Sequence, residues 1–306
     1  FKIRTSRGMV RSKLGVNSAG LYADYVARLA GVSRYKIYPC RGEYVIIDKA
    51  RSDLIQRMIY PVPPKGGSGL GVHLTPTIDG NILIGPSAAY VRSKTNDGTT
   101  GAMARQLVKE AQELLPGLSS RDVITSYAGL RPKTVSSAVG GFNDFTIEEL
   151  PELPGMMHLV GIESPGLTAA PAIALDVARW AGTHLPLRPK HQFHPERKAP
   201  LIFNDLPPEE QADLVDAEPD YGQIICRCEN ITRKEILDAI HNPLGAQTLG
   251  AIKYRSRATM GRCQGGFCGP NIEKIMEEEL GVQPTEMSLK GEGSWLFTGS
   301  TKDLRN

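Results

Sequence analysis

Two short cysteine motifs near the end of the chain decide how its last domain must fold. The first is ICRCENITRKEIL, residues 225–237, in which two cysteines stand one residue apart ahead of a helix-like run. The second is GRCQGGFCGPN, residues 261–271, in which two cysteines are separated by four residues of a glycine-rich turn. The four cysteines are Cys226, Cys228, Cys263 and Cys268. Only Cys40 lies elsewhere, so the pattern indicates a site that folding brings together.

The spacing of these cysteines favours an iron-sulfur cluster. Four thiolates can bind either a cluster or a tetrahedral zinc ion. C-x-C suits a single small ion poorly, because neighbouring side chains of extended backbone point in opposite directions. A two-iron cluster spreads its ligands over two metals, and the glycines allow backbone N–H groups to converge on sulfur. We therefore predict a 2Fe-2S cluster, with zinc, buried free thiols or a disulfide as alternatives.

The two motifs together resemble a known module. C-x-C followed after 34 residues by MGRCQGGFC is similar to the bacterioferritin-associated-ferredoxin-like (BFD-like) 2Fe-2S domain. This small, mainly helical module follows a flavin domain in larger oxidoreductases. The resemblance covers residues 221–281 and implies that Cys226, Cys228, Cys263 and Cys268 are the cluster ligands.

A basic run lies beside the second motif. It comprises Lys253, Arg255, Arg257 and Arg262, with no acidic residue among them. Such a run is typical of a solvated face. Beside a cluster it can also raise the reduction potential or dock an electron-transfer partner.

Composition sets the outer bounds. The 306 residues are 41% hydrophobic, which is enough for about two domains. A net charge of +3 lacks the basic excess typical of nucleic-acid binding. There is no apolar run of about 18 residues and no signal-like start. We therefore expect a cytoplasmic protein without a transmembrane segment, and any membrane association to run through a partner.

Composition also places the domain boundaries. Residues 195–220 are rich in proline and carboxylates, as in a linker. They separate a first domain, residues 1–194, from the cysteine-bearing domain, residues 221–281, and residues 282–306 form a tail.

The first domain mixes strand and helix patterns. Strands are predicted over residues 43–49, 54–62 and 122–132, and helices over residues 21–31, 98–115 and 166–182. Asp79 and Gly80 predict a tight hairpin between two further strand-like runs. The fold class is therefore α+β.

Motifs of this domain, in their order, resemble the D-amino-acid-oxidase-like flavoproteins. They are KLGVNSAGLYAD (13–24), GVHLTPTIDGNILIGPSA (71–88), YAGLRPK (127–133) and VGIESPGLTAAPAIA (160–174). They are similar to the branch of FAD-dependent glycerol-3-phosphate dehydrogenases and L-2-hydroxyglutarate oxidases. The resemblance implies FAD, a substrate domain with a mixed or antiparallel sheet, and part of an FAD-binding domain.

Two departures from the family pattern stand out. The G-x-G-x-x-G phosphate-binding turn is missing, because nothing before Lys13 can hold its strand, turn and helix. We therefore expect the C-terminal part of a longer protein, poor at binding FAD by itself. The turn SPGLTAA is nearer the hydroxy-acid branch, although the cluster module resembles that of anaerobic-type glycerol-3-phosphate dehydrogenases.

The resemblance also implies which residues line the cofactor. Where a strand runs through a glycine turn into a helix, the helix N-terminus can offer N–H groups to the flavin ring. A plain strand-to-helix turn is the alternative. The expected cofactor-binding residues are Asn17, Ala19, Gly20, Gly161, Ser164, Pro165, Gly166, Leu167 and Thr168.

Substrate contacts are expected from four polar residues. Arg131 is the predicted anchor, because a guanidinium fork suits a carboxylate or phosphate. A surface arginine or a structural ion pair is the alternative. His73 is the predicted proton acceptor, since imidazole titrates near neutral pH, although a strand histidine can be structural. Arg41 and Tyr44 are further pocket candidates.

These elements predict a dehydrogenase that oxidises a small anionic secondary alcohol. Glycerol 3-phosphate is the first candidate substrate and 2-hydroxyglutarate the second. Electrons would pass from flavin through the cluster to an acceptor protein or subunit, because a simple oxidase needs no cluster. A non-catalytic module that binds an iron-sulfur cluster, zinc or a partner is the rival from another class.

Overall fold

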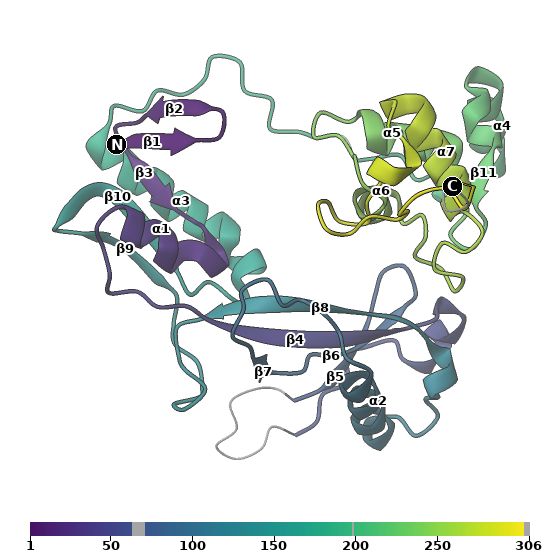
Figure 1. Cartoon of the computed structure of the whole chain (residues 1–306), viewed down its shortest axis with the longest axis horizontal. Helices are drawn as coiled ribbons and strands as arrows, with labels where there is room; N and C mark the ends of the chain where they lie inside the picture. The colour runs from purple at the N-terminus through teal and green to yellow at the C-terminus, as the bar shows by residue number, and fades with distance from the viewer. Residues whose placement is uncertain (63–70, 198, 303–306) are drawn as a thin grey trace. The chain divides into compact units, whose positions relative to one another are not determined.

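The chain folds as two compact units. The computed structural model of the protein describes residues 1–62, 71–197 and 199–302. Contacts within the chain divide it into Phe1–Phe193 and His194–Asn306 (Figure 1). No helix among the described residues is both long and apolar enough to cross a bilayer.

A five-stranded antiparallel sheet forms the centre of the first unit. Its strands are β4 (Tyr38–Ile47), β5 (His73–Pro76), β6 (Ile82–Gly85), β7 (Ala89–Tyr90) and β8 (Val123–Lys133). β4 pairs with β8 along its whole length and with β6 and β7 on its other edge (Figure 1). β5 and β6 form the predicted hairpin, with Gly80 in its turn at a φ of 87°. Positive φ is the conformation that favours glycine there.

The two faces of this sheet pack differently. Val45 and Ile47 of β4 pack into a core with helix α2 (Gly101–Leu114). Successive side chains of a strand alternate between faces, so Cys40, Gly42 and Tyr44 lie on the face away from α2. One face of the sheet is therefore closed by a helix, and the other is available to line a site.

A smaller sheet completes the first unit. It contains β3 (Gly15–Asn17), β10 (Leu153–Val160) and β9 (Thr146–Leu150), with β3 parallel to β10 and β9 antiparallel. Helices α1 (Ala23–Leu29) and α3 (Gly166–His184) and the hairpin β1 (Lys2–Thr5) and β2 (Gly8–Arg11) belong to the same unit. Short 3-10 helices lie at Gly20–Tyr22, Lys49–Leu54 and Ser120–Asp122. Because β10 leads directly toward α3, this sheet positions the turn that was expected to meet the flavin.

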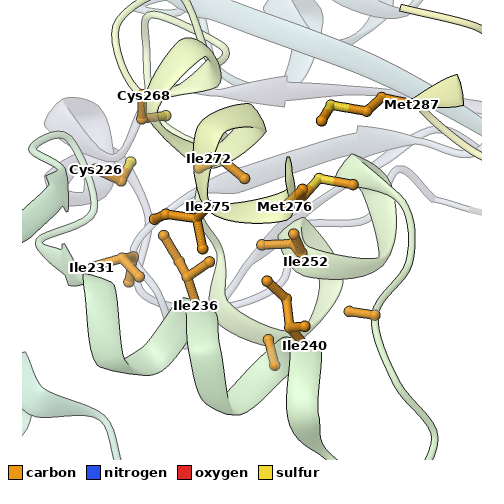
Figure 2. Packing of buried hydrophobic residues seen from close by; sticks show 13 residues of the cluster. Cys226, Ile231, Ile236, Ile240, Ile252, Cys268, Ile272, Ile275, Met276 and Met287 are labelled. Atoms are coloured by element: carbon orange, nitrogen blue, oxygen red, sulfur yellow. The ribbon is translucent and has the colours of Figure 1, made fainter. Parts of the chain in front are cut away.

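The second unit is mainly helical. Its elements are α4 (Pro208–Ala217), β11 (Ile224–Cys226), β12 (Ile231–Thr232), α5 (Arg233–His241), α6 (Leu249–Ser256) and α7 (Gly269–Leu280), with 3-10 helices at Phe203–Asp205, Pro219–Gly222 and Pro284–Glu286. Buried Ile236, Ile252, Ile272 and Met276 pack between α5, α6 and α7 (Figure 2). The α+β class, with a small helical domain, is confirmed.

The segments expected to be linker and tail also carry structure. α4 lies within residues 195–220, and Phe203 stacks on Tyr221 with ring centroids 5.6 Å apart. Met287, in the expected tail, is buried in the core of the second unit. Residues 303–306 of that tail lie outside the described residues.

Candidate functional sites

The four cysteines of the second unit form two pairs of sulfur atoms. Sγ of Cys228 lies 3.6 Å from Sγ of Cys263. Cys226 and Cys268 hydrogen bond to each other through their side chains. Each pair therefore combines one cysteine of the C-x-C motif with one of the C-x4-C motif. Two thiolates on one tetrahedral metal with bonds of about 2.3 Å lie about 3.7 Å apart, so the Cys228–Cys263 separation fits two ligands of one metal.

This arrangement fits a cluster better than a single ion. Within the described part of the chain, no three His, Cys, Asp or Glu side chains converge as one metal ion would require. Two pairs of sulfurs, of which Cys228–Cys263 has the spacing of ligands on one metal, suit a centre with two irons. The side chains of Cys226 and Cys228 point in different directions, and this allows each sulfur to belong to a different pair.

Backbone N–H groups turn toward these sulfurs. The pKa of Cys263 is lowered, first by the Phe267 amide and also by that of Gly265. The pKa of Cys226 is lowered to about 6 by the Cys268 thiol and by backbone amides that include Thr259. The pKa of Cys268 is raised, because it holds the proton of that pair and is buried. Donated N–H groups stabilise negative sulfur, which is what cluster ligation needs.

Local sequence explains how the cysteines reach these positions. β11 and β12 form a short hairpin that carries the C-x-C motif, and Thr232 with Glu235 closes a capping box where α5 begins. Cys268 is the N-cap of α7, and Pro270 occupies its first turn as expected. The positive end of the α7 dipole therefore lies at Cys268, one of the predicted cluster ligands.

Gly261 gives the first testable consequence of this packing. A Cβ added at Gly261 would stand 2.2 Å from Cβ of Cys228 and 3.3 Å from its Sγ. Because backbone has to shift to relieve such a clash, we expect Gly261→Ala to lower bound iron and acid-labile sulfide at least fivefold. Gly269→Ala is the matched control, since its Cβ would meet only Oε1 of Glu273 at 3.8 Å. Equal iron content in the two variants would contradict the predicted packing.

A cavity of about 1270 Å³ lies within the first unit, lined by residues of β4, β8, α2 and the start of α3. Its lining includes the predicted residues His73, Tyr44, Arg131, Ser164, Pro165, Gly166, Leu167 and Thr168. Small-molecule pockets measure about 300 to 1,000 Å³, so this space exceeds what a small substrate needs. It has room for part of a cofactor beside a substrate.

Strand register assembles the floor of this cavity. Arg131 lies opposite Cys40, Gly129 opposite Gly42, and Tyr127 opposite Tyr44. Side chains directly opposite one another in an antiparallel pair share a face. Between the arginine at one end and the stacked rings of Tyr44 and Tyr127, 5.1 Å apart, at the other, open space lies only over Gly129.

Arg131 is a half-buried cation without a carboxylate partner among the described residues. Its Nη2 donates to the carbonyl of Ser87 at 2.5 Å. A Cβ on Gly42 would stand 3.1 Å from that Nη2, so the glycine makes room for the guanidinium. Within the part of the chain that the structure describes, Arg131 thus has no structural ion pair of the kind weighed against a substrate role, and its charge can pair with an anion.

The neighbouring Lys133, in contrast to Arg131, has a carboxylate partner. Its Nζ pairs with Oε1 of Glu163 at 2.9 Å, and both side chains are buried. It also donates to the carbonyl of Gly141 and lies 4.2 Å from the ring centroid of Phe142. Lys133 and Glu163 line the cavity as a neutralised pair, which the sequence pattern did not single out.

His73 has a defined hydrogen-bonding direction. Its Nδ1 lies 3.1 Å from the carbonyl of Gly71, and its ring stacks on Tyr60 with centroids 4.8 Å apart. A carbonyl only accepts, so Nδ1 carries the hydrogen in this contact. Nε2 then holds the lone pair and can accept a proton.

The α3 turn is shaped by two glycines. Gly161 has a φ of 72°, and a Cβ there would stand 2.7 Å from Cγ2 of Thr134. A Cβ on Gly166 would stand 2.5 Å from Cγ2 of Ile162. α3 begins at Gly166 without a side-chain cap, and its first residues line the cavity. An uncapped helix start with positive dipole fits the electron-rich edge of a flavin.

Five of the predicted residues do not line the cavity. Arg41 points to the α2 side, where it pairs with Glu43 at 2.9 Å and donates to Asn96. Asn17 is buried and donates to the carbonyl of Ala23, so it holds the turn after β3. The others are Ala19, Gly20 and Gly161. Roles of these residues in cofactor or substrate binding remain predictions.

Fold and sites together define a flavin-linked oxidoreductase with a cluster-binding module. The chain belongs to the FAD dependent oxidoreductase family, which residues 1–180 match, and residues 224–278 match the BFD-like [2Fe-2S] binding domain. Both resemblances drawn from the sequence are thereby confirmed. So are the predicted cofactors, FAD and a 2Fe-2S cluster, as those of the family and the domain.

Several characterised proteins are similar to this chain. A glycerol 3-phosphate dehydrogenase of Caloramator mitchellensis is 41% identical over 99% of this chain and 62% of its own length. A glycerol 3-phosphate oxidase of Mycoplasma pneumoniae is 33% identical over 57% of this chain and 44% of its own length. An L-2-hydroxyglutarate dehydrogenase of Indibacter alkaliphilus is 31% identical over 58% and 53%. The chain thus spans between 44% and 62% of these relatives.

Solved structures agree on the fold. The glycerol-3-phosphate dehydrogenase of Bacillus halodurans complexed with FAD aligns with a TM-score of 0.56 at 16% identity, over 89% of this chain and 59% of that one. L-proline dehydrogenase from P. horikoshii aligns with a TM-score of 0.51 at 22% identity, over 60% and 46%. At these identities the likeness concerns the fold alone.

Proposed function

We propose that this chain carries the substrate site and the electron outlet of an FAD-dependent dehydrogenase that oxidises glycerol 3-phosphate. The observation that carries the proposal is Arg131, a half-buried guanidinium that faces the cavity with no carboxylate partner in the described residues. A cation in such a place attracts an anionic substrate. The relative that matches 99% of the chain, named glycerol 3-phosphate dehydrogenase, supports phosphate as the anion.

The residues of the cavity take separate roles in this proposal. Arg131 binds the phosphate in two-pronged contact, while the Ser87 carbonyl fixes its orientation. His73 takes the hydroxyl proton at Nε2, because Gly71 holds the hydrogen at Nδ1. Lys133 stays paired with Glu163 and adds no net charge near the substrate.

The cofactors would be held at the two sites described above. Gly166, Leu167 and Thr168 at the start of α3 face the flavin, and Cys226, Cys228, Cys263 and Cys268 bind the cluster. When bound, FAD accepts hydride from the substrate and the 2Fe-2S centre carries single electrons onward to an acceptor protein. An outlet of this kind favours a dehydrogenase over an oxidase.

Flavin bleaching tests the proposal. In the full-length protein loaded with both cofactors, anaerobic addition of glycerol 3-phosphate should bleach the flavin absorbance and then reduce the cluster. Bleaching by L-2-hydroxyglutarate alone would assign the chain to the hydroxy-acid branch. If neither compound bleaches the flavin while replacement of the cysteines still abolishes function, the module is non-catalytic.

A further inference from the structure

The loops that hold the cysteines present an unusual outer surface. Arg227 stands between Cys226 and Cys228 and is exposed, and Arg262 directly precedes Cys263 and is exposed. Phe267 directly precedes Cys268 and is 83% exposed, although a phenyl ring is normally buried. Each of the three side chains is adjacent in sequence to a ligand cysteine. We call Arg227, Arg262 and Phe267 the outlet surface.

The charge around the outlet surface is strongly positive. Residues 224–232 and 251–270, which contain all four cysteines, hold five basic residues and a single carboxylate, Glu229. That carboxylate has a buried side chain, and its Oε2 lies 3.0 Å from Nε of Arg257. When the cluster is bound, its thiolates carry negative charge below the surface. The exposed charged side chains next to the cysteines, Arg227 and Arg262, are positive.

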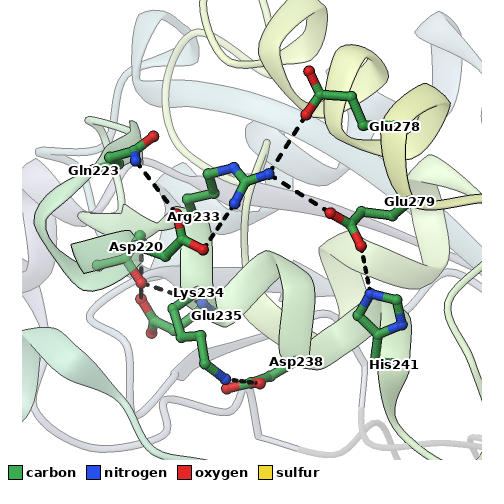
Figure 3. A network of polar contacts seen from close by, with 10 residues as sticks. Asp220, Gln223, Arg233, Lys234, Glu235, Asp238, His241, Glu278 and Glu279 are labelled. Carbon is green, nitrogen blue, oxygen red and sulfur yellow. Dashed lines mark hydrogen bonds and ion pairs between the residues drawn. The ribbon is translucent and has the colours of Figure 1, made fainter. Parts of the chain in front are cut away.

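Three carboxylates of the same unit form a separate network of ion pairs. Glu278 and Glu279 lie near the C-terminal end of α7, where Arg233 and His241 pair with them (Figure 3). Asp220 pairs with the same arginine at 2.8 Å. Glu278 lies ten positions after Cys268, about 15 Å along α7 at 1.5 Å per residue. These three carboxylates are therefore engaged with Arg233 and His241 in a network of their own.

The composition of the outlet surface matches that of a protein interface. Arginine and aromatic side chains are enriched at the centre of such interfaces, and complementary charge speeds encounter and fixes orientation. Phe267 offers an exposed apolar contact, and Arg227 and Arg262 offer exposed positive charge, on the loops that carry the cysteines. Each of the three residues is adjacent in sequence to a cysteine, so a carrier bound here has a short path to the sulfurs.

We infer that the outlet surface docks an acidic one-electron carrier protein. The inference rests on the proposed function, because it names the class of acceptor that receives the electrons. It assigns docking to Arg227 and Arg262 by charge and to Phe267 by apolar contact. Neither residue type is needed to ligate the cluster, so docking and cluster binding can be separated.

The test measures binding of a defined acidic probe. The full-length protein with both cofactors is titrated with a purified plant-type 2Fe-2S ferredoxin by calorimetry, and cytochrome c serves as a basic probe. We expect ferredoxin to bind more tightly than cytochrome c, and its Kd to rise about tenfold between 20 and 200 mM salt. Arg227→Glu with Arg262→Glu should raise that Kd at least tenfold, and Phe267→Ser at least threefold.

A matched control keeps the change in net charge constant. Lys274→Glu with Lys302→Glu reverses two exposed lysines outside the cysteine loops and should change Kd less than twofold. Iron and sulfide content must equal wild type in every variant, and Arg227→Gln with Arg262→Gln should give an intermediate Kd. Equal affinity of wild type and the double arginine variant would overturn the inference, as would binding to phosphatidylglycerol vesicles in place of ferredoxin.

Failure of this inference is distinguishable from failure of the proposed function. Flavin bleaching by glycerol 3-phosphate reports on the first unit and needs no carrier. Ferredoxin binding reports on the second unit and needs no substrate. If the arginine variants also slow reduction of the cluster by substrate but leave ferredoxin affinity unchanged, the outlet surface serves electron entry, and the docking assignment is wrong.

Discussion

Arg131→Leu is expected to lower kcat/KM for glycerol 3-phosphate by about 10²- to 10³-fold in the full-length protein. Removing one member of a desolvated charge pair costs about 3 to 4 kcal/mol, which corresponds to this range. The loss should fall mainly on KM, because the guanidinium binds the phosphate in the ground state as well as in the transition state. Stopped-flow flavin reduction over a range of substrate concentrations separates KM from the limiting rate.

Two further variants make the Arg131 result specific. Arg131→Lys keeps the charge but loses the planar fork, so an intermediate loss is expected. Arg105→Leu removes an exposed arginine from α2, outside the cavity lining, and should change kcat/KM less than twofold. Free guanidinium should restore part of the activity of Arg131→Leu. A kcat/KM within threefold of wild type would show that the anion binds elsewhere.

Local patterns were sufficient to predict most elements of the first unit. The helix expected over residues 98–115 is α2 at Gly101–Leu114, and the strand expected over residues 122–132 is β8 at Val123–Lys133. Both signals are local, because periodicity and caps reside in the segment itself. Thr100 illustrates this, since its side chain accepts from the Met103 amide and starts α2.

Residues 54–62 show where a local pattern is wrong. The sequence predicted a strand there, but the structure has only an isolated bridge between Ile59 and Leu74, after a 3-10 helix that ends at Leu54. Pro61 cannot donate to a strand ladder, which limits pairing at this point. The apolar residues that suggested a strand contribute to the core instead, since Ile55 is buried against α2.

The candidate site depends on contacts that no local pattern encodes. Arg131 was singled out by its chemistry, but its bond to Ser87 requires that β8 align with β4 and that the chain after β6 return beside them. The Lys133–Glu163 pair likewise joins residues 30 positions apart. Lys133 and Glu163 each lie in a motif that the sequence had singled out, and this was the only local signal for the pair. That the two charges neutralise each other is visible only in the tertiary fold.

The prolines of residues 195–220 are compatible with two kinds of local structure, a linker and the start of a helix. Several prolines with many carboxylates are typical of a linker, as the sequence suggested. Pro208 and Glu209 also suit the first turn of a helix, because that position needs no N–H donor and favours negative charge. The structure has α4 at Pro208–Ala217, so here the helix-start signal determines the local structure.

Replacing any one of the four ligand cysteines by alanine is expected to remove at least nine-tenths of the bound iron and sulfide. A 2Fe-2S cluster needs both sulfur pairs, and each pair takes one cysteine from each motif. Cys226→Ala and Cys263→Ala belong to different motifs and different pairs, yet both should lose the visible absorbance of the cluster and keep that of the flavin. Flavin bleaching by substrate should persist, whereas electron transfer to an external acceptor protein should fall at least 100-fold.

Cys40→Ala is the matched control for metal content. Cys40 is fully buried in β4 of the first unit, so its removal should leave iron and sulfide per protein unchanged. Metal analysis and the visible spectrum of anaerobically purified protein check each variant. If metal analysis of the wild type finds one equivalent of zinc and no sulfide, the four cysteines bind a structural zinc ion and not a cluster. Retention of the visible cluster spectrum in Cys228→Ala would show that the 3.6 Å Cys228–Cys263 pair is not the ligand pair of one metal.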